Sequence, residues 1–196
     1  MSTPPTTSQQ NQRRQFFATA GAPVLSAAAL SLLAGHSTRA LAATPMADSD
    51  VGILNVALTL EHEAIGAYQL GAESGLLTKP VQSVALLFQS HHKAHRDALI
   101  GAIEKLGGTP VAAKSLKELG MALQAHTLQN QTDVLALARR LEGGAANAYL
   151  GVLPSFKDAK LGTVAARLAA DETMHWTALT QAMGLALPTA ALSFGA

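Results

Sequence analysis

Apolar residues recur at intervals of three and four positions along four separate segments of the chain. This spacing is typical of amphipathic helices that bury one face against a core. Ser, Asp or Pro stands at the start of the first two segments, and Gly or Pro stands at the end of all four. The pattern therefore predicts helices over residues 49–71, 79–107, 132–153 and 157–183.

The connections between these segments predict how the helices are arranged. Short links join the first segment to the second and the third to the fourth, as in helical hairpins. Between the second and third lie about 23 residues, 109–131, in which residues 115–126 also have a helix-like pattern. The sequence therefore predicts an all-α domain, an antiparallel four-helix bundle made of two hairpins joined by a long crossover.

The two predicted hairpins repeat each other in sequence. The first and third helices share a motif, which reads Leu60-Glu61-x-x-Ala64-x-x-Ala67-Tyr68 and Leu141-Glu142-x-x-Ala145-x-x-Ala148-Tyr149. The second and fourth share another, which reads His92-x-x-His95-x-x-Ala98-Leu99 and Glu172-x-x-His175-x-x-Ala178-Leu179. The offset is 81 residues in the first pair and 80 in the second. Two similar hairpins related by a pseudo-twofold axis would produce this pattern.

Each predicted apolar stripe carries ionisable residues near its middle, and no Lys or Arg lies on these stripes. The six residues are Glu61, His92, His95, Glu142, Glu172 and His175. Burying a lone carboxylate costs several kcal/mol, so such a group needs a partner. A cation from outside the chain would supply the missing charge.

The spacing and the residue types fit a metal site. Residues three apart on a helix share a face, so Glu172 and His175 can reach one site, as can His92 and His95. The chain has no cysteine, which excludes thiolate ligands, iron–sulfur clusters and covalently attached haem. Carboxylate and imidazole ligands favour iron or manganese, with zinc as an alternative. Ligands from four helices can hold two divalent ions about 3.5–4 Å apart.

In these residues the chain resembles the ferritin-like di-iron carboxylate superfamily. Its pattern is one Glu on each of two helices and Glu-x-x-His on each of the other two. Glu61 and Glu142 match the single glutamates, and Glu172 with His175 matches one Glu-x-x-His. The resemblance covers roughly residues 49–184 and is greatest with exported bacterial ferritin-like proteins that carry a twin-arginine signal. It implies chemistry with oxygen, peroxide or iron, of a ferroxidase-like or peroxidase-like kind.

One position departs from the superfamily pattern. Where a second Glu-x-x-His belongs, the chain has His92-x-x-His95, so an imidazole replaces a carboxylate and the set becomes three Glu and three His. An alternative register is Gln89-x-x-His92, although the repeat places His95 opposite His175.

Other polar residues near the motifs are expected to lie outside the site. Glu63 falls about 200° round the helix from Glu61, which predicts a solvated side chain. His62 and His126 are expected on the surface or in the crossover, while His91 is close enough to support a ligand. Tyr68 and Tyr149 are expected in the core, with the alternative of donating hydrogen bonds or electrons to the site. Trp176 is expected to pack against its neighbours.

The N-terminal residues predict export. Arg13-Arg14-Gln15-Phe16-Phe17 precedes a moderately apolar run over residues 18–35, and Ala40-Leu41-Ala42 offers a cleavage site. This arrangement resembles a twin-arginine signal, with a general secretory signal or an uncleaved anchor as alternatives. The run is too short and too weakly apolar for stable membrane insertion. The predicted organisation is a signal over 1–42, a linker over 43–48, the bundle over 49–184 and a tail over 185–196.

Charge narrows the range of partners. The whole chain has a formal net charge of +1, and removal of residues 1–42 leaves 11 basic and 13 acidic residues. No large basic surface is expected, which argues against nucleic acid as a partner.

The sequence therefore predicts an exported metalloprotein of the periplasm or cell envelope that binds two divalent ions. Three roles are consistent with it: a redox enzyme acting on oxygen or peroxide, a non-catalytic metal-binding protein, and a structural or stress-related bundle with a degenerate site. A homo-oligomer is compatible with all three.

Overall fold

The computed structural model describes residues 49–195, and the chain forms an all-helical bundle there. The predicted signal and linker lie outside the described residues. The main elements are α3 (Asp50–Glu73), α4 (Lys79–Lys105), α5 (Leu116–Ala122), α6 (Gln131–Val152) and α7 (Ala159–Ala182), with 3₁₀ turns at Ala125–Thr127 and Leu153–Ser155. The bounds of the four long helices agree with the sequence predictions within two residues. The predicted helical bundle is therefore confirmed.

Local chemistry fixes where these helices begin and end. Ser49 Oγ accepts a hydrogen bond from Gly52 N at 3.1 Å, and Asn130 Oδ1 accepts one from Asp133 N at 3.0 Å. Both side chains satisfy amide groups that have no partner within the first turn of a helix. At the end of α4, Gly107 adopts a φ of 75°, which a residue with a side chain rarely takes.

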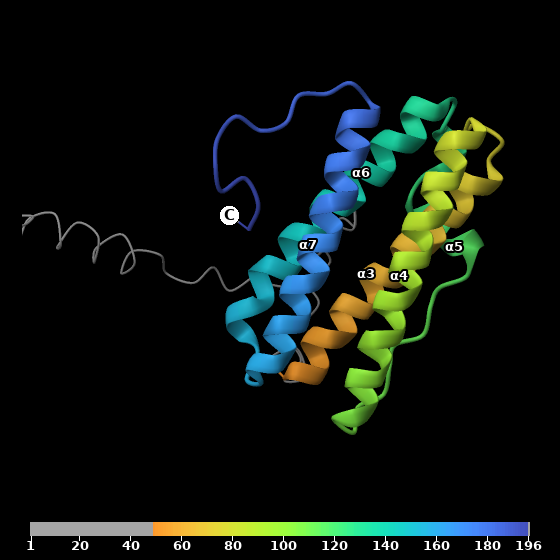
Figure 1. The fold of residues 1–196 in the computed structure, drawn as a ribbon. Coiled ribbons are helices and arrows are strands. Elements are labelled where there is room, and N and C mark those ends of the chain that lie inside the picture. Colours follow the sequence, from red (N-terminus) through yellow and green to blue (C-terminus); the bar gives the residue numbers. More distant parts are fainter. Residues whose placement is uncertain (1–48, 196) are drawn as a thin grey trace, which may run out of the picture.

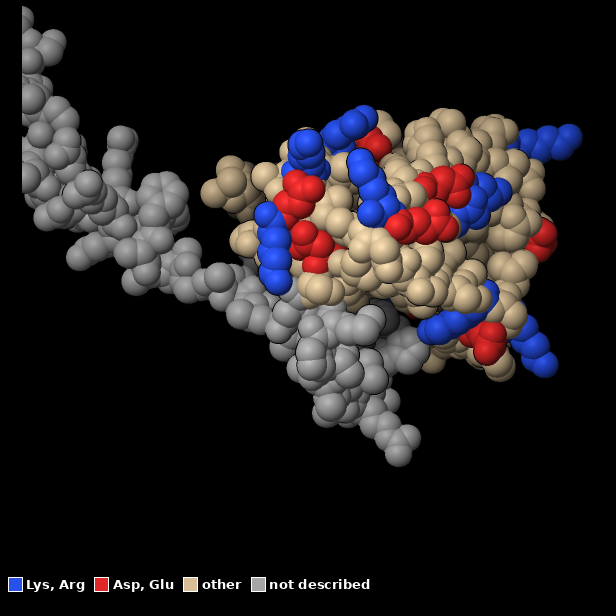
Figure 2. Space-filling model, turned by 90° about the horizontal axis from the view of Figure 1, so that it is seen from below, with Lys and Arg blue, Asp and Glu red and all other residues tan. Residues whose placement is uncertain are grey.

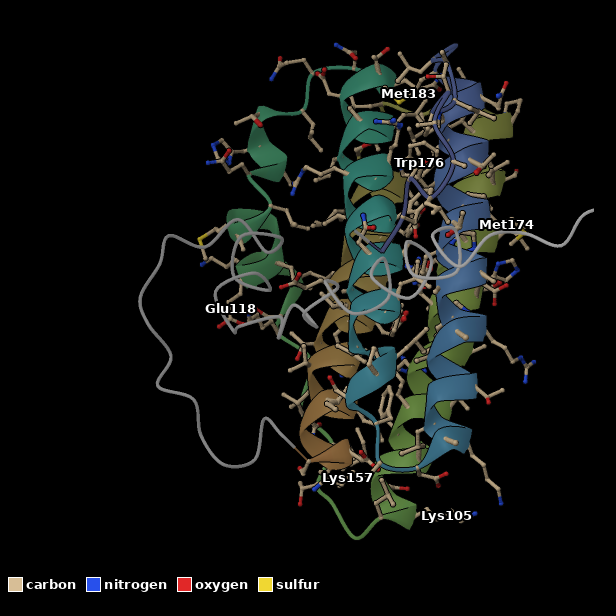
Figure 3. All side chains as sticks on the ribbon, turned by 90° about the vertical axis from the view of Figure 1, so that its left-hand side faces the viewer. Lys105, Glu118, Lys157, Met174, Trp176 and Met183 are labelled. Atoms are coloured by element: carbon tan, nitrogen blue, oxygen red, sulfur yellow. The ribbon has the colours of Figure 1, made fainter. Side chains whose placement is uncertain are left out.

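The four long helices form two antiparallel hairpins (Figure 1). α3 packs along α4, and α6 packs along α7, while α3 and α6 bring the two hairpins together. The crossover with α5 runs along the outside of α3. Figure 3 shows the antiparallel order, because Lys157 before α7 and Lys105 at the end of α4 lie at one end of the bundle, opposite Met183.

Two apolar clusters lie toward the two ends of the bundle, with a polar layer between them. The larger cluster centres on Leu54, Leu58, Leu99, Ile103, Tyr149 and Leu168. The smaller cluster is made of Tyr68, Ala85, Phe88, Leu135 and Leu179. The six predicted site residues lie between these clusters along the four helices, which places ionisable groups at the centre of an otherwise apolar core.

Charged residues of both signs are mixed on the surface of the bundle (Figure 2). On the face shown in Figure 2, Lys and Arg lie beside Asp and Glu instead of forming a patch of one sign. Among the helices within residues 49–195, none combines the length and the apolar character that a membrane crossing requires.

Candidate metal centre

The structure brings all six predicted residues together at the middle of the bundle. They form two overlapping groups, in each of which the potential ligand atoms lie within 4.8 Å of one another. The first group is Glu61, His92, His95 and Glu172, and the second is His92, Glu142, Glu172 and His175. All six side chains are buried. Residues on four different helices therefore converge on one small volume.

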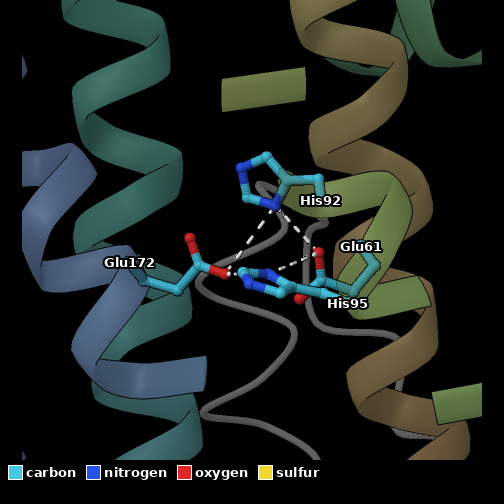
Figure 4. Close-up of side chains that lie close together, drawn as sticks. All are labelled: Glu61, His92, His95 and Glu172. Atoms are coloured by element: carbon cyan, nitrogen blue, oxygen red, sulfur yellow. Dashed lines mark hydrogen bonds and ion pairs between the residues drawn. The ribbon is translucent and has the colours of Figure 1, made fainter. Parts of the chain in front are cut away.

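The first group joins α3, α4 and α7 (Figure 4). His92 Nδ1 lies 2.8 Å from Glu61 Oε2, and His95 Nδ1 lies 3.1 Å from Glu172 Oε1. His95 Nδ1 is also 3.7 Å from Glu61 Oε2. The nitrogen of His95 that faces the site is thus its Nδ1.

The second group joins α4, α6 and α7. His175 Nδ1 lies 3.1 Å from Glu172 Oε2 and 3.4 Å from Glu142 Oε2. His92 Nε2 lies 3.1 Å from Glu142 Oε1. His175 therefore faces the site through Nδ1, as its counterpart His95 does in the first group.

Glu172 and His92 belong to both groups. One carboxylate oxygen of Glu172 faces His95 and the other faces His175, each at 3.1 Å. The two ring nitrogens of His92 likewise face Glu61 and Glu142. These residues are counterparts in the sequence repeat, at an offset of 80. The site thus contains one carboxylate and one imidazole at equivalent central positions.

Two tyrosines bind the outer glutamates, Glu61 and Glu142. Each tyrosine lies on one hairpin and reaches across the pseudo-twofold axis to the glutamate of the other hairpin. Tyr68 on α3 donates its hydroxyl hydrogen to Glu142 on α6, and Tyr149 on α6 donates to Glu61 on α3. Burial raises the pKa of both hydroxyls, as do the neighbouring carboxylates, so they remain protonated donors. The prediction that these tyrosines lie in the core is confirmed, and their hydroxyls also donate to site glutamates, as the alternative proposed.

Two further residues contact the outward nitrogens of the terminal histidines. His95 Nε2 lies 3.1 Å from Asp171 Oδ2, and His175 Nε2 lies 2.9 Å from His91 Nδ1. His91 and Asp171 are also related by the offset of 80, each directly before a central residue. His91 was expected as a supporting group from its position, whereas Asp171 was missed. The repeat itself could have identified Asp171.

Charges inside the site are balanced by the histidines. Burial would lower the pKa of His92, but hydrogen bonds to Glu142 and Glu61 raise it well above the ordinary 6.5. Burial opposes the same change at His95, where bonds to Glu172 and Glu61 raise the pKa to about 10. The protein without a bound ion thus contains imidazolium groups beside its carboxylates. The expectation that an external cation would supply this charge was incomplete, because protonated histidines also supply it.

The pKa values of the three carboxylates shift in different directions. Burial would raise the pKa of Glu61 and Glu142, but hydrogen bonds from His92 and other imidazoles lower it below 4.5. Burial raises the pKa of Glu172, although His175 and His95 oppose the change. No buried side-chain nitrogen or oxygen among the described residues lacks a hydrogen-bond partner.

The structure does not support the alternative register, Gln89-x-x-His92. Gln89 donates from its amide nitrogen to Ile65 O at 3.0 Å and to Gln69 Oε1 at 2.8 Å, so this amide binds α3. In the register that the repeat indicated, His92 and His95 both face the site.

One expectation near the site was wrong. Glu63 was expected to be solvated, but its side chain is buried because the crossover covers that side of α3. Lys114, from the crossover, places Nζ 4.0 Å from Glu63 Oε1. Helical periodicity alone could not reveal this cover. Trp176 packs as expected, with the guanidinium of Arg139 4.6 Å from the centre of its ring.

The donor set fits divalent metal ions. Three carboxylates and three imidazoles with no sulfur are ligands suited to iron, manganese or zinc. Asp171 and His91 orient two of the imidazoles, as supporting residues do in protein metal sites. These buried Glu and His residues could hold a metal ion.

Comparisons with known proteins agree with this fold. The sequence profile of the ferritin-like domain family matches residues 49–185. The chain is also similar in structure to a conserved hypothetical protein, rv2844, from Mycobacterium tuberculosis. That similarity has a TM-score of 0.60 and 24% identity, and it covers 71% of this chain and 94% of the other. No curated protein matches the chain.

The charge balance predicts how the stability of the metal-free protein depends on pH. The stability contributed by His95 is complete below pH 6.5 and is lost as the pH rises through about 10. The contribution of Glu61 and Glu142 is present above pH 4.5 and is lost as the pH falls below it, while Glu172 offsets part of this loss. Thermal midpoints followed by circular dichroism should therefore be highest between about pH 4.5 and 6.5. The alkaline decline should be shallower in His95→Gln, and a midpoint that rises from pH 6.5 to 10 would contradict the assignment.

Substitution of Asp171, which is not one of the six candidate ligands, is expected to lower the affinity for metal. Asp171→Asn keeps the shape but removes the charge that orients His95, so affinity should fall about 10–100-fold. Competition against a chromophoric chelator measures this directly. Asp97→Asn, on the exposed face of α4 beside Arg96, is the matched control and should leave affinity unchanged. Equal affinities of the two variants would exclude a supporting role for Asp171.

Proposed function

The chain belongs to the ferritin-like domain family, and from this premise we propose that it is a metalloprotein with a dinuclear site for iron or manganese. The observation that supports it best is the pair of overlapping donor groups related by the sequence repeat. Bound iron or manganese would supply one-electron redox chemistry toward oxygen or peroxide. This makes an oxidoreductase the leading function.

Different residues of the chain would hold the two ions. Glu61 with His95, and Glu142 with His175, would serve one ion each, since each pair belongs to only one donor group. Glu172 would serve both ions, because its two oxygens already face the two groups. Tyr68 and Tyr149 would keep Glu142 and Glu61 in place, and burial of the layer would limit the access of water.

Ion binding would displace protons from the histidines. His95 and His175 face the site through Nδ1, and their pKa values are raised, so this nitrogen carries a proton in the metal-free protein. A ligand nitrogen must be free of its proton. Asp171 and His91 accept from the opposite ring nitrogens and so keep each ring in the orientation that presents Nδ1.

A second candidate function follows from His92. This ring lies between Glu61 and Glu142 and, when doubly protonated, donates to both. The positive charge of this ring then balances the two carboxylates, as a bound ion would otherwise do. The same fold could therefore act as a structural bundle whose site no longer requires metal.

Metal loading distinguishes these functions. Protein purified in its folded form and loaded with Fe²⁺ or Mn²⁺ should contain about two ions per chain by elemental mass spectrometry. Glu142→Gln should retain about one ion, because Glu142 lies in one donor group, and Glu172→Gln should lose part of both. Glu73→Gln, exposed at the end of α3, is the control and should load fully. Less than about half an ion per wild-type chain would refute the proposal and favour the structural role.

Turnover separates a redox enzyme from a metal-binding protein. The loaded protein should consume peroxide or oxidise Fe²⁺ if it is an enzyme, and should do neither if it only holds metal.

We also propose that residues 1–42 direct export by the twin-arginine route, to the periplasm or cell envelope. Paired arginines before an apolar run support this, and a folded bundle loaded before transport suits that route. Arg13→Lys with Arg14→Lys should retain the protein in the cytoplasm, as measured by cell fractionation. Arg39→Lys, outside the pair, is the control. Export of the double variant at the wild-type level would exclude this route.

A further inference from the structure

An apolar cavity of about 280 Å³ lies at the end of the bundle that contains the smaller core cluster. It is lined by the last turns of α3 and α7, the first turns of α4 and α6, Leu77 of the connection between α3 and α4, and the end of the crossover. No charged side chain lines it, and its only lining side chain with a polar group is that of Tyr68. That hydroxyl is already bound to Glu142. The cavity therefore offers apolar contact and no free side-chain hydrogen-bonding group.

The cavity is not a consequence of the sequence repeat. At the equivalent place in the other half of the bundle, near Tyr149, the corresponding cavity measures only about 10 Å³. There Phe156, from the connection between α6 and α7, packs on the core. In the connection between α3 and α4, the offsets of 81 and 80 pair Phe156 with Gly75 and Leu76, and Leu77 lines the cavity without filling it. One end is thus filled and the other is open.

The cavity adjoins the candidate metal centre. Its inner wall includes Tyr68 and Phe88. The ring of Phe88 stacks on His175 with 4.2 Å between centres, and the ring of Tyr68 stacks on His92 with 5.5 Å between centres. One layer of aromatic side chains therefore separates the cavity from the residues of the second donor group.

The outer opening has the same apolar character. Pro80 and Ala178 are exposed lining residues, and Val84 keeps 43% of its surface exposed. A molecule entering here meets no ionised lining group that could pair with a charge, so a carboxylate or phosphate inside would lose hydration without compensation. A neutral polar end group costs less to desolvate and can lie inside the opening, whereas a carboxylate has to stay fully hydrated outside it, which limits how deeply its chain can enter.

From these observations we propose that the cavity binds an uncharged, largely hydrocarbon molecule, such as a saturated chain of about ten carbon atoms. A dry apolar cavity of about 150 Å³ holds benzene, so about twice that volume admits roughly twice as many carbon atoms. Binding itself is independent of the proposed function. The role of such a molecule as a substrate of the metal centre rests on that function, through the shared wall of Tyr68 and Phe88.

A fluorescent probe tests binding directly. 1-Aminoanthracene, a small apolar dye, should bind the wild-type protein saturably at one site with enhanced fluorescence. Decan-1-ol should displace it, whereas decanoate should displace it at least tenfold less well because of its charge. Titrations are made with metal-free and metal-loaded protein.

Two substitutions from different helices should fill the cavity. Ala138→Leu on α6 and Ala67→Leu on α3 each place extra carbon atoms among the lining residues, and each should weaken dye binding at least tenfold. Ala166→Leu, exposed on α7 and outside the lining, is the matched control and should bind as wild type does. Circular dichroism confirms that each variant is folded.

The outcomes separate this proposal from the metal proposal. Absence of saturable binding to wild type, or unchanged binding in a folded cavity-filled variant, overturns the cavity site even if the protein loads metal. Displaceable binding that the two variants weaken supports it even if no metal is taken up, in which case only the substrate role falls.

Discussion

The burial of three carboxylates in one layer is the constraint on which the rest of the structure depends. Glu61, Glu142 and Glu172 come from three helices, and each would be costly in an apolar core without partners. Imidazoles from α4 and α7 lie between them, and tyrosines from α3 and α6 donate hydrogen bonds to Glu142 and Glu61. These partners reach the layer only if the two hairpins pack in one register. The polar layer therefore specifies the arrangement that the apolar clusters above and below it stabilise.

The repeat provides two equivalent frameworks, and substitutions make them chemically different. Glu172 and His92 occupy equivalent central positions, yet one is an acid and the other a base. Asp171 and His91 occupy equivalent supporting positions, but a carboxylate accepts more strongly from an imidazole than a second imidazole does. His95 is therefore the more strongly supported of the two terminal histidines. The geometry is nearly symmetric, whereas the affinities of its two halves for an ion should differ.

Sequence patterns predicted the helices and the six convergent residues because both follow from helical periodicity and from an internal repeat. The same patterns did not reveal Asp171, since a residue that contacts a ligand from outside lies off the inward stripe. They also misplaced Glu63, because the path of the crossover depends on tertiary packing that periodicity does not encode. The sequence did not predict the cavity, for a further reason. The lining residues Ala85 and Ala138 have the counterparts Ala165 and Ala57 at the filled end, so composition alone does not separate the two ends.

The two halves of the polar layer have different surroundings, and we therefore expect them to have different roles. On the side of His95, the Asp171 side chain is 50% exposed and connects the ligand to water. On the side of His175, the half-buried His91 also connects the ring to the surface, and Phe88 and Tyr68 lead in addition to an apolar cavity. Ions and protons are stabilised by polar contacts, so they would exchange most readily on the Asp171 side. Apolar molecules, including oxygen, would approach through the cavity. In the proposed metalloprotein, ions could therefore enter past polar groups and apolar molecules through the cavity, while the carboxylates stay buried.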